Sequence, residues 1–381
     1  MRELPYMKSP YNKRNWGNKW HSLCSYHGKL KPSIAHWLVK LFTEKGETVL
    51  DPLSGVGTIP FEACLQARIG IGNDLSRLAY VVTKAKLNVR GRHDVDLVLL
   101  ELDKFIQDNI NKYKYILPYK EFGFNKTIPE YFHEDTYREI LCARDYFIQK
   151  EDYTPSESIV LSVILHILHG NRPYALSRKS HPLTPYAPTG EFIYKNLIEH
   201  VKNKLDIIYK DFDTDVDEQM TFLENENDWS QYVEGKAIHG DAFDINKKLN
   251  YKVDNIITSP PFVASMKFYI QNWMRLWFVG WEPEDYKKAE KIYLESRQKS
   301  SLSVYEEFFR VCSNQLKDNG KMILHLGKSK QCDMAKELAI IAEPYFKVIF
   351  MGDEDVSNLE KHGIKDKGGT SHHQFLFLQK K

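Results

Sequence analysis

The sequence has few cysteines and no long apolar run. Its five cysteines lie far apart among 381 residues and form no C-x-x-C pair. This spacing argues against a disulfide framework and a structural zinc site, and it favours a reducing compartment. No stretch approaches the roughly 18–20 apolar residues that span a bilayer, and the polar, aromatic beginning does not resemble a signal peptide. We therefore expect a cytoplasmic protein.

The chain also lacks an excess of charge of either sign. It contains 53 Lys and Arg against 51 Asp and Glu, which gives a net charge of +2. Any binding to nucleic acid must therefore come from a local basic patch. The hydrophobic fraction of 42% is enough for a packed core and excludes a disordered chain. No internal repeat is present, so we expect a globular protein in two parts.

A βαβ unit is predicted near the N-terminus. Apolar patterns predict a helix over 32–43, a strand at 48–50, a helix over 59–67 and a strand at 69–73. Before them, residues 1–27 are basic and aromatic, and they indicate either an arm packed on the core or one that contacts substrate. The order of strand, glycine loop, helix and strand predicts the start of a parallel, doubly wound sheet.

The middle of the chain is mostly helical in character. Residues 92–235 are interpreted as an inserted helical subdomain between 28–91 and 236–381, with a long irregular loop at 171–190. The predicted helices of this insert cover 95–112, 136–150, 156–169 and 192–209, after a helix at 75–89.

The α/β pattern returns in the C-terminal part. Strands are predicted at 236–240, 253–258, 321–326, 347–350 and 374–378, and helices at 304–316 and 333–343. With the two N-terminal strands these give seven. The sequence therefore predicts an α/β protein with a doubly wound, mostly parallel, seven-stranded Rossmann-like sheet and an inserted helical subdomain.

Three acidic residues follow predicted strands of this sheet. Asp51 opens the run DPLSGVGT, whose glycines allow a close backbone approach to a ligand at a helix N-terminus. Asp74 lies 17 residues beyond Gly57, where a carboxylate can accept hydrogen bonds from ribose hydroxyls. Asp241 ends the next strand and could accept from an adenine amino group. The alternative is plain turn chemistry for the glycine loop and for Asp241, and a helix N-cap for Asp74.

The run Thr258-Ser259-Pro260-Pro261-Phe262 is the most specific segment. Two prolines cannot continue a central strand, and they leave a rigid turn that offers mainly acceptors. Such a turn suits the binding of an NH2 group, with the Phe262 ring as a surface on which a planar base stacks. A strand terminator with a buried phenylalanine is the alternative.

Together, DPLSGVGT and TSPPF resemble the motifs of the amino-group DNA methyltransferases, which use S-adenosylmethionine. The resemblance covers roughly 28–90 and 236–381, and the run HGKLKP at 27–32 is similar to a further cofactor motif of that family. It implies catalytic roles for Ser259, Pro260, Pro261 and Phe262. It implies that the cofactor is held by Lys31, Pro32, Asp51, Pro52, Ser54, Gly55, Gly57, Thr58, Asp74 and Asp241.

The resemblance also implies a reaction and partners. Methyl transfer to cytosine N4 is favoured over adenine N6, because Ser259 stands where the adenine enzymes more often have Asn or Asp. The target base would be flipped out of double-stranded DNA, no metal is needed, and a cognate restriction endonuclease could act separately. A tRNA guanine-N2 methyltransferase, a protein-glutamine methyltransferase and a non-catalytic DNA-binding scaffold are the alternatives.

Contacts to DNA are expected from the helical insert. Within its long loop, the candidates for phosphate or base contacts are Asn171, Arg172, Arg178 and Lys179, with His181 beside them. A solvated charged loop is the alternative. The stripe of Tyr269, Trp273, Trp277 and Trp281 has helical spacing, which is more typical of a core-facing helix than of a base-stacking platform.

Overall fold

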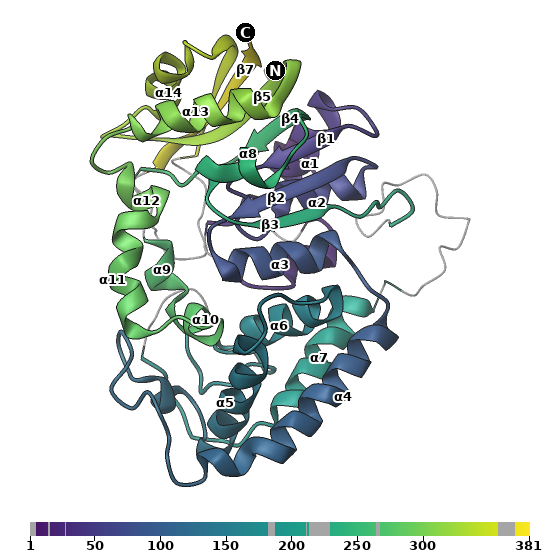
Figure 1. Cartoon of the computed structure of the whole chain (residues 1–381), viewed down its shortest axis with the longest axis vertical. Helices are drawn as coiled ribbons and strands as arrows, with labels where there is room; N and C mark the ends of the chain where they lie inside the picture. The colour runs from purple at the N-terminus through teal and green to yellow at the C-terminus, as the bar shows by residue number, and fades with distance from the viewer. Residues whose placement is uncertain are drawn as a thin grey trace.

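A sheet fills one end of the molecule and a group of helices fills the other (Figure 1). The computed structural model describes residues 5–13, 16–26, 28–181, 187–210, 212, 229–263, 267–356 and 370–381. Arg14 and His27 of the arm and the motif before the first helix lie outside the described residues, as do 182–186 of the long loop and Ser265 at the start of the aromatic stripe.

The sheet has seven strands in the order β3-β2-β1-β4-β5-β7-β6. Neighbours from β3 to β5 pair in parallel, whereas β7 is antiparallel to both β5 and β6. The prediction of a mostly parallel, seven-stranded Rossmann-like sheet is confirmed. The strands are β1 (Thr48–Asp51), β2 (Ile69–Asp74), β3 (Lys236–His239), β4 (Val253–Thr258), β5 (Leu316–Ser329), β6 (Phe346–Asp355) and β7 (Thr370–Lys380).

Helices cover both faces of the sheet, which is why consecutive apolar residues occur in its central strands β1 and β4. Because successive strand residues point to opposite faces, Val49 packs in the core below α1 and α2, and Leu50 packs in the core below α13 and α14. The covering elements are α1 (Pro32–Phe42) and α2 (Thr58–Leu65) on one face, and η6 (Ala242–Asp244), α8 (Ile245–Lys248), α13 (Val304–Gln315) and α14 (Met334–Ala342) on the other.

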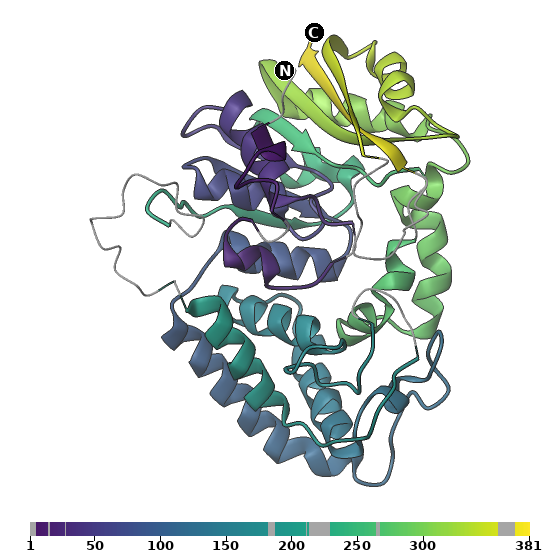
Figure 2. The same ribbon diagram turned by 180° about the vertical axis from the view of Figure 1, so that it is seen from behind.

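The helical group lies beyond the β3 side of the sheet, and α3 (Arg77–Leu87) faces it (Figures 1 and 2). The short helices α9 to α12 run from this group to the sheet. The group contains α4 (Arg92–Asn109), η3 (Ile110–Tyr113), η4 (Ile128–Tyr131), α5 (Glu134–Ile148), α6 (Pro155–Ile167) and α7 (Leu197–Tyr209), and the connecting helices are α9 (Phe268–Gln271), α10 (Trp273–Phe278), α11 (Pro283–Ile292) and α12 (Leu294–Arg297).

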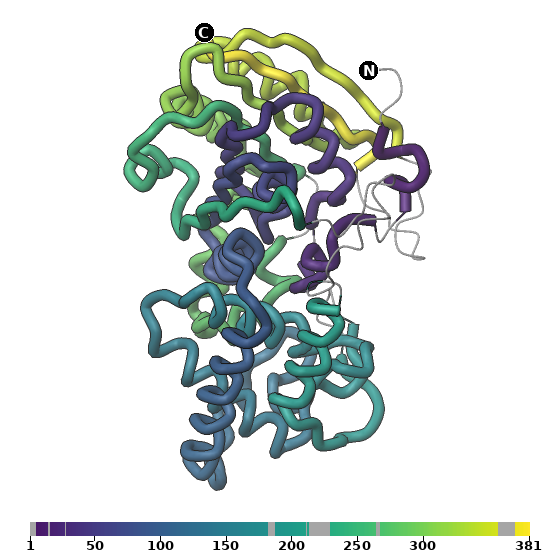
Figure 3. The backbone as a smooth tube through the Cα atoms, turned by 90° about the vertical axis from the view of Figure 1, so that its right-hand side faces the viewer, coloured from purple at the N-terminus to yellow at the C-terminus, as the bar shows by residue number. Residues whose placement is uncertain are grey.

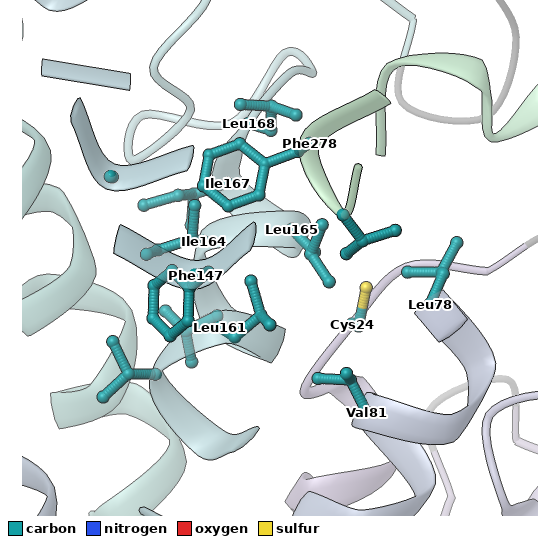
Figure 4. Close-up of a cluster of buried hydrophobic side chains, with 14 of the residues drawn as sticks. Cys24, Leu78, Val81, Phe147, Leu161, Ile164, Leu165, Ile167, Leu168 and Phe278 are labelled. Atoms are coloured by element: carbon teal, nitrogen blue, oxygen red, sulfur yellow. The ribbon is translucent and has the colours of Figure 1, made fainter. Parts of the chain in front are cut away.

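One core joins the N-terminal arm, α3 and the helical group (Figure 4). Cys24 of the arm and Leu78 of α3 lie in the same cluster as Leu165 of α6 and Phe278 of α10, and all four are buried. The aromatic stripe belongs to this cluster, since Trp273 and Trp277 are also buried in it. The expectation of a core-facing stripe is confirmed for Tyr269 in α9 and for Trp273 and Trp277 in α10, whereas Trp281 lies beyond α10 and is partly buried.

The described part of the arm is anchored on the sheet side. It contains two 3-10 turns, η1 (Pro5–Met7) and η2 (Lys19–Ser22). Trp20 and His21 are buried, and His21 Nε2 lies 2.7 Å from the buried Glu62 carboxylate, which also lies 3.1 Å from His36 Nδ1. Here the arm is part of the core, as one of the two expectations had it.

Several predicted boundaries differ from the observed ones. The predicted helix at 192–209 begins only at Leu197, because Thr136 exchanges hydrogen bonds with the Lys195 backbone and the Asn196 side chain caps the helix at Glu199. Strands β5 to β7 are longer than predicted, because antiparallel pairing continues through their polar ends.

Gly70 tests how closely α2 packs on β2. A Cβ added there would lie 2.0 Å from the Pro60 carbonyl oxygen, whereas Gly91 has nothing within 4 Å and an ordinary backbone conformation. We expect Gly70→Ala to lower the free energy of unfolding by about 1–3 kcal/mol or more through overpacking. Gly91→Ala, at the N-cap of α4 where glycine is preferred over alanine, should lower it by less than Gly70→Ala does, because the added methyl group meets no neighbour. Equal urea midpoints for the two variants would contradict this packing.

Candidate functional site

The carboxyl ends of four parallel strands meet at one edge of the sheet. Thr258 at the end of β4 donates its hydroxyl to Asp51 Oδ1 at the end of β1, at 2.7 Å. From the end of β2, Asn73 Nδ2 donates to the Pro52 and Gly240 carbonyls, both at 3.0 Å. The predicted motifs therefore form one site at the edge where open α/β sheets bind their ligands.

The glycine loop between β1 and α2 has the backbone that its sequence predicts. Gly55 and Gly57 adopt φ values of +51° and +69°, and Gly57 is the N-cap of α2, followed by Thr58 as its first residue. A Cβ on Gly57 would lie 2.8 Å from the Thr83 hydroxyl. Both positions therefore require glycine, which leaves the loop backbone close to any ligand bound over it.

Asp74 holds this loop against β2. Its carboxylate accepts from the Gly55 N–H at 2.9 Å and from the Ser76 N–H at 2.8 Å. Burial raises the pKa of Asp74 to about 6, and these two backbone bonds oppose the shift. Each carboxylate oxygen has a second lone pair, so the group can accept from a ligand hydroxyl as well.

Asp51 is more strongly affected by burial. It accepts from Leu53 N–H at 3.1 Å in addition to Thr258. Burial raises its pKa to about 7, while the two hydrogen bonds act in the opposite direction and the nearby Asp74 adds to the rise. A buried carboxylate of this kind favours a cationic ligand group beside it.

The remaining predicted cofactor residues have partly structural roles. Asp241 accepts from Phe243 N–H at 3.1 Å as the N-cap of η6. Lys31 is the N-cap residue of α1 and donates to the Asn12 carbonyl at 3.2 Å, and Pro32 is the first residue of that helix. Whether these residues also contact a cofactor stays a prediction.

The segment before α1 reaches the glycine loop through Tyr26, which the sequence did not single out. A Cβ on Gly55 would lie 3.3 Å from the Tyr26 ring, and the other side of this tyrosine packs on Phe268 at a centroid distance of 5.2 Å. The approach could not be read from spacing, because the three residues belong to distant parts of the chain.

The TSPPF turn is supported from β5 and α12. Ser259 Oγ lies 3.0 Å from His325 Nδ1, and burial lowers the pKa of His325 well below its ordinary value, so this ring is neutral. Gln298 donates to the Pro261 carbonyl at 2.9 Å and is itself held by the Tyr305 hydroxyl at 2.8 Å. Among the described residues no donor reaches the carbonyl of the buried Pro260.

Phe262 packs against two histidines that the sequence did not point to as site residues. Its ring lies 5.5 Å from the ring of His325 and 6.1 Å from that of His373, and Gly327 gives it room, since a Cβ there would lie 2.5 Å from the phenylalanine. A histidine inside the apolar run of β5 was the one available signal for His325. Phe262 is half-buried, so part of its ring remains accessible.

The predicted DNA contacts of the long loop differ in their surroundings. Asn171, Arg172 and Lys179 are exposed. Arg178 is used within the protein, because it donates to the Gly190 carbonyl at 2.8 Å and packs 4.1 Å from the Phe192 ring centroid. Its guanidinium therefore stabilises the loop and has fewer N–H groups left to bind a ligand.

Comparisons with known proteins agree with this site. Residues 19–110 match the model of the UPF0020 family, described as an RMKL-like methyltransferase domain. This span contains the glycine loop and Asp74. Within these residues the chain is similar to a methyltransferase domain. The cofactor of the site is therefore S-adenosylmethionine, as predicted, and the order of the seven strands fits such a domain.

The chain also matches solved structures at low sequence identity. TrmN from Thermus thermophilus is 12% identical, with a TM-score of 0.33 over 93% of this chain, which spans only 50% of TrmN. A TehB-like SAM-dependent methyltransferase from Corynebacterium glutamicum is 8% identical, with a TM-score of 0.33 over 91% of this chain and 87% of that one. The rRNA methyltransferase aviRa from Streptomyces viridochromogenes is 11% identical, with a TM-score of 0.36 over 94% and 88%.

No curated protein sequence matches the chain significantly. None of the described helices is long and apolar enough to cross a membrane.

The residues at the strand ends fit S-adenosylmethionine. The hydroxyl of Ser54 and Oδ1 of Asn73 are buried and have no hydrogen-bond partner among the described residues. These groups flank the loop and the two carboxylates. Asp51 matches a cationic amino group and Asp74 matches ribose hydroxyls, so the donor and acceptor set suits the polar parts of this cofactor.

The raised pKa of Asp51 predicts a dependence of stability on pH. In the unfolded chain the pKa of Asp is about 3.9, so between that pH and about 7 the native state holds a proton that the unfolded chain releases. Stability therefore falls as pH rises through this window. We expect Asp51→Asn to gain stability relative to the wild type as pH rises from 5 to 8, measured by urea unfolding.

The matched control is Asp108→Asn, at an exposed position of α4. Its effect on the free energy of unfolding should not vary with pH over the same range. A difference between Asp51→Asn and the wild type that is constant from pH 5 to pH 8 would show that Asp51 is ionised throughout.

Proposed function

We propose that this chain transfers a methyl group to the exocyclic amino group of a nucleic-acid base. The observation that carries the proposal is the hydrogen bond from Thr258 to Asp51, which joins the TSPPF turn to the glycine loop. An acceptor turn for an amine and a loop for the cofactor then share one edge of the sheet. S-adenosylmethionine supplies an electrophilic methyl group on a sulfonium when it is bound.

The turn offers acceptors to a base amine. The lone pair of such an amine is conjugated with its ring and is a poor nucleophile. Ser259 Oγ and the Pro260 carbonyl would each accept one N–H, which turns the nitrogen lone pair away from the ring. The amine becomes positive in the transition state, so both bonds strengthen there. The Pro261 carbonyl is already bound by Gln298 and is not needed.

His325 acts as a positioning residue for Ser259. To accept from the amine with its lone pairs, Ser259 must direct its own proton elsewhere, and His325 Nδ1 lies 3.0 Å away. Because this ring is neutral, Nδ1 can accept that proton. Phe262, backed by the His325 ring on one side, would stack on the base. A base from a duplex reaches this turn only when it is flipped out.

Two classes of nucleic acid are candidates for the substrate. Ser259 at the first position of the turn favours DNA, with cytosine N4 ahead of adenine N6. RNA, with guanine N2 as the amine, is the second candidate, and the solved structures that the chain matches include an rRNA methyltransferase. The acceptors of the turn suit the amine of a DNA base and that of guanine in RNA alike.

Replacing Ser259 tests the role of the turn. We expect Ser259→Ala to lower kcat by about 10²-fold, as when one preorganised hydrogen bond to a developing charge is lost. The dissociation constant for S-adenosylmethionine, measured by calorimetry, should stay the same. Ser300→Ala, at an exposed position, is the control and should retain full activity. Wild-type turnover by Ser259→Ala would remove Ser259 from the mechanism.

The modified base identifies the substrate. Nucleic acid from cells that express the protein should contain one new methylated base, separated by mass spectrometry of nucleosides. N4-methylcytosine or N6-methyladenine in DNA would establish the DNA candidate, and N2-methylguanine in RNA the other. The Ser259→Ala variant expressed in the same cells is the control and should remove the new base. A modified base that persists with this variant comes from another enzyme.

A further inference from the structure

A group of cations lies where the arm, the end of α6 and α7 meet. In Figure 3 this part of the arm (purple) runs between the sheet and the teal helices. Three of the cations are Lys29 before α1, Arg172 in the loop after α6, and Lys204 on α7. His166 of α6 contacts the arm at Ser25, and the charges of Lys204, Arg172 and Lys29 act on it. The buried Arg275 of α10 acts on the same histidine.

Hydrogen bonds fix the surroundings of this cluster. His166 Nδ1 lies 3.0 Å from the Ser25 backbone nitrogen and 3.1 Å from its hydroxyl, and His166 Nε2 lies 3.2 Å from the Tyr174 hydroxyl. The Lys204 ammonium stands over the Tyr174 ring at 5.5 Å from its centroid. Lys29 donates to the His21 carbonyl at 2.7 Å.

No carboxylate balances these charges. Among the residues that the structure describes, Lys29, Arg172 and Lys204 form no ion pair with Asp or Glu. Lys204 is only 3% exposed. Burial lowers the pKa of Lys29 and of Lys204 to about 8, and the cations around Lys204 lower its pKa further. The neighbouring Cys24 is a neutral thiol, since burial raises its pKa.

A buried cation without a counter-ion is costly in free energy. The effective penalty for one buried ion is several kcal/mol, whereas a partly desolvated cation–π contact returns about 1–2 kcal/mol. The contact with Tyr174 therefore does not offset the burial of Lys204. An anion that enters the cluster would remove this deficit, and the Ser25 and Tyr174 hydroxyls lie beside it as further hydrogen-bonding groups.

The cluster adjoins the candidate active site through two consecutive residues. Ser25 belongs to the cluster, and the next residue, Tyr26, packs on Gly55 of the glycine loop and on Phe268. An anion here would lie beside the catalytic edge, at the junction of the sheet with the helical group.

We propose that Lys29, Arg172 and Lys204 form a binding site for one phosphate of the nucleic-acid strand whose base enters the TSPPF turn. This inference rests on the proposed function for the nature of the strand. The ligand chemistry is a phosphodiester, which DNA and RNA share. Three cations from separate elements would fix the register of the strand against the turn, as phosphate contacts do in other complexes.

The salt dependence of binding tests this site. Neutralising one phosphate contributes about 0.9 to the slope of log K against log salt for duplex DNA and about 0.7 for single strands. The variant Arg172→Gln/Lys204→Gln should reduce the slope by about that amount and weaken binding roughly tenfold at 0.1 M salt. Parallel titrations with a DNA duplex and an RNA strand show which of the two strands the site holds.

Matched controls distinguish the loss of this site from a general loss of positive charge. Lys104→Gln/Lys202→Gln removes the same charge from exposed positions of α4 and α7 and should leave the slope at its wild-type value. The single variant Arg172→Gln changes an exposed residue, so it folds even if replacement of Lys204 disturbs the interior. Arg172→Gln should reduce the slope of log K against log salt by less than the double variant does. Binding of S-adenosylmethionine, measured without nucleic acid, should stay at the wild-type value in all variants.

The outcomes for the two proposals are distinct. Wild-type slopes in both Arg172→Gln and the double variant, with methyl transfer intact, would overturn the phosphate site and keep the methyltransferase function. A reduced slope in a chain that methylates neither DNA nor RNA would support the phosphate site and overturn the proposed function. Competition by inorganic phosphate with the wild-type slope retained in the variants would also overturn the phosphate site.

Discussion

The hydrogen bond between Thr258 and Asp51 is the contact on which the rest of the site depends. It links the ends of two neighbouring parallel strands inside the protein, where an unpaired carboxylate or hydroxyl would be costly. The glycine loop begins at one of these residues, and the proline turn begins after the other. A single buried bond therefore sets the spacing of the cofactor loop and the turn that would receive the amine.

Much of this arrangement follows from local sequence. The strand ends, the two glycines with positive φ and the rigid Pro260-Pro261 turn each depend on neighbouring residues, and parallel pairing then brings them to one edge. The contacts of Tyr26 with Gly55 and of His325 with Ser259 could not be predicted in this way. Each joins segments that are distant in the chain, and no pattern within either segment specifies the partner.

In the helical insert, too, contacts between distant segments could not be predicted from local sequence. Its helices were predicted by their apolar periodicity, but the start of α7 is set by the backbone N–H groups of Lys195 and Leu197, which donate to Thr136 and Glu139 of α5. Arg178 reads as a free cation in the sequence, whereas in the structure it is bound to the Gly190 carbonyl and to the Phe192 ring. The near-zero net charge is likewise a sum over separate regions, with buried carboxylates at the strand ends and unpaired cations at the junction.

The shared core of Figure 4 has a consequence for protein engineering. Because Cys24 and Leu78 pack with Leu165 and Phe278, the helical group and the cofactor side are built on the same interior. The insert, residues 92–235, therefore cannot be exchanged as an independent domain between related enzymes. A graft that removes these neighbours would expose the apolar side chains of Cys24 and α3. The arm that carries Tyr26 would then lose packing, and the cofactor loop that Tyr26 contacts would be distorted. A chimera with altered substrate choice would have to transplant the arm, α3 and α10 together with the insert.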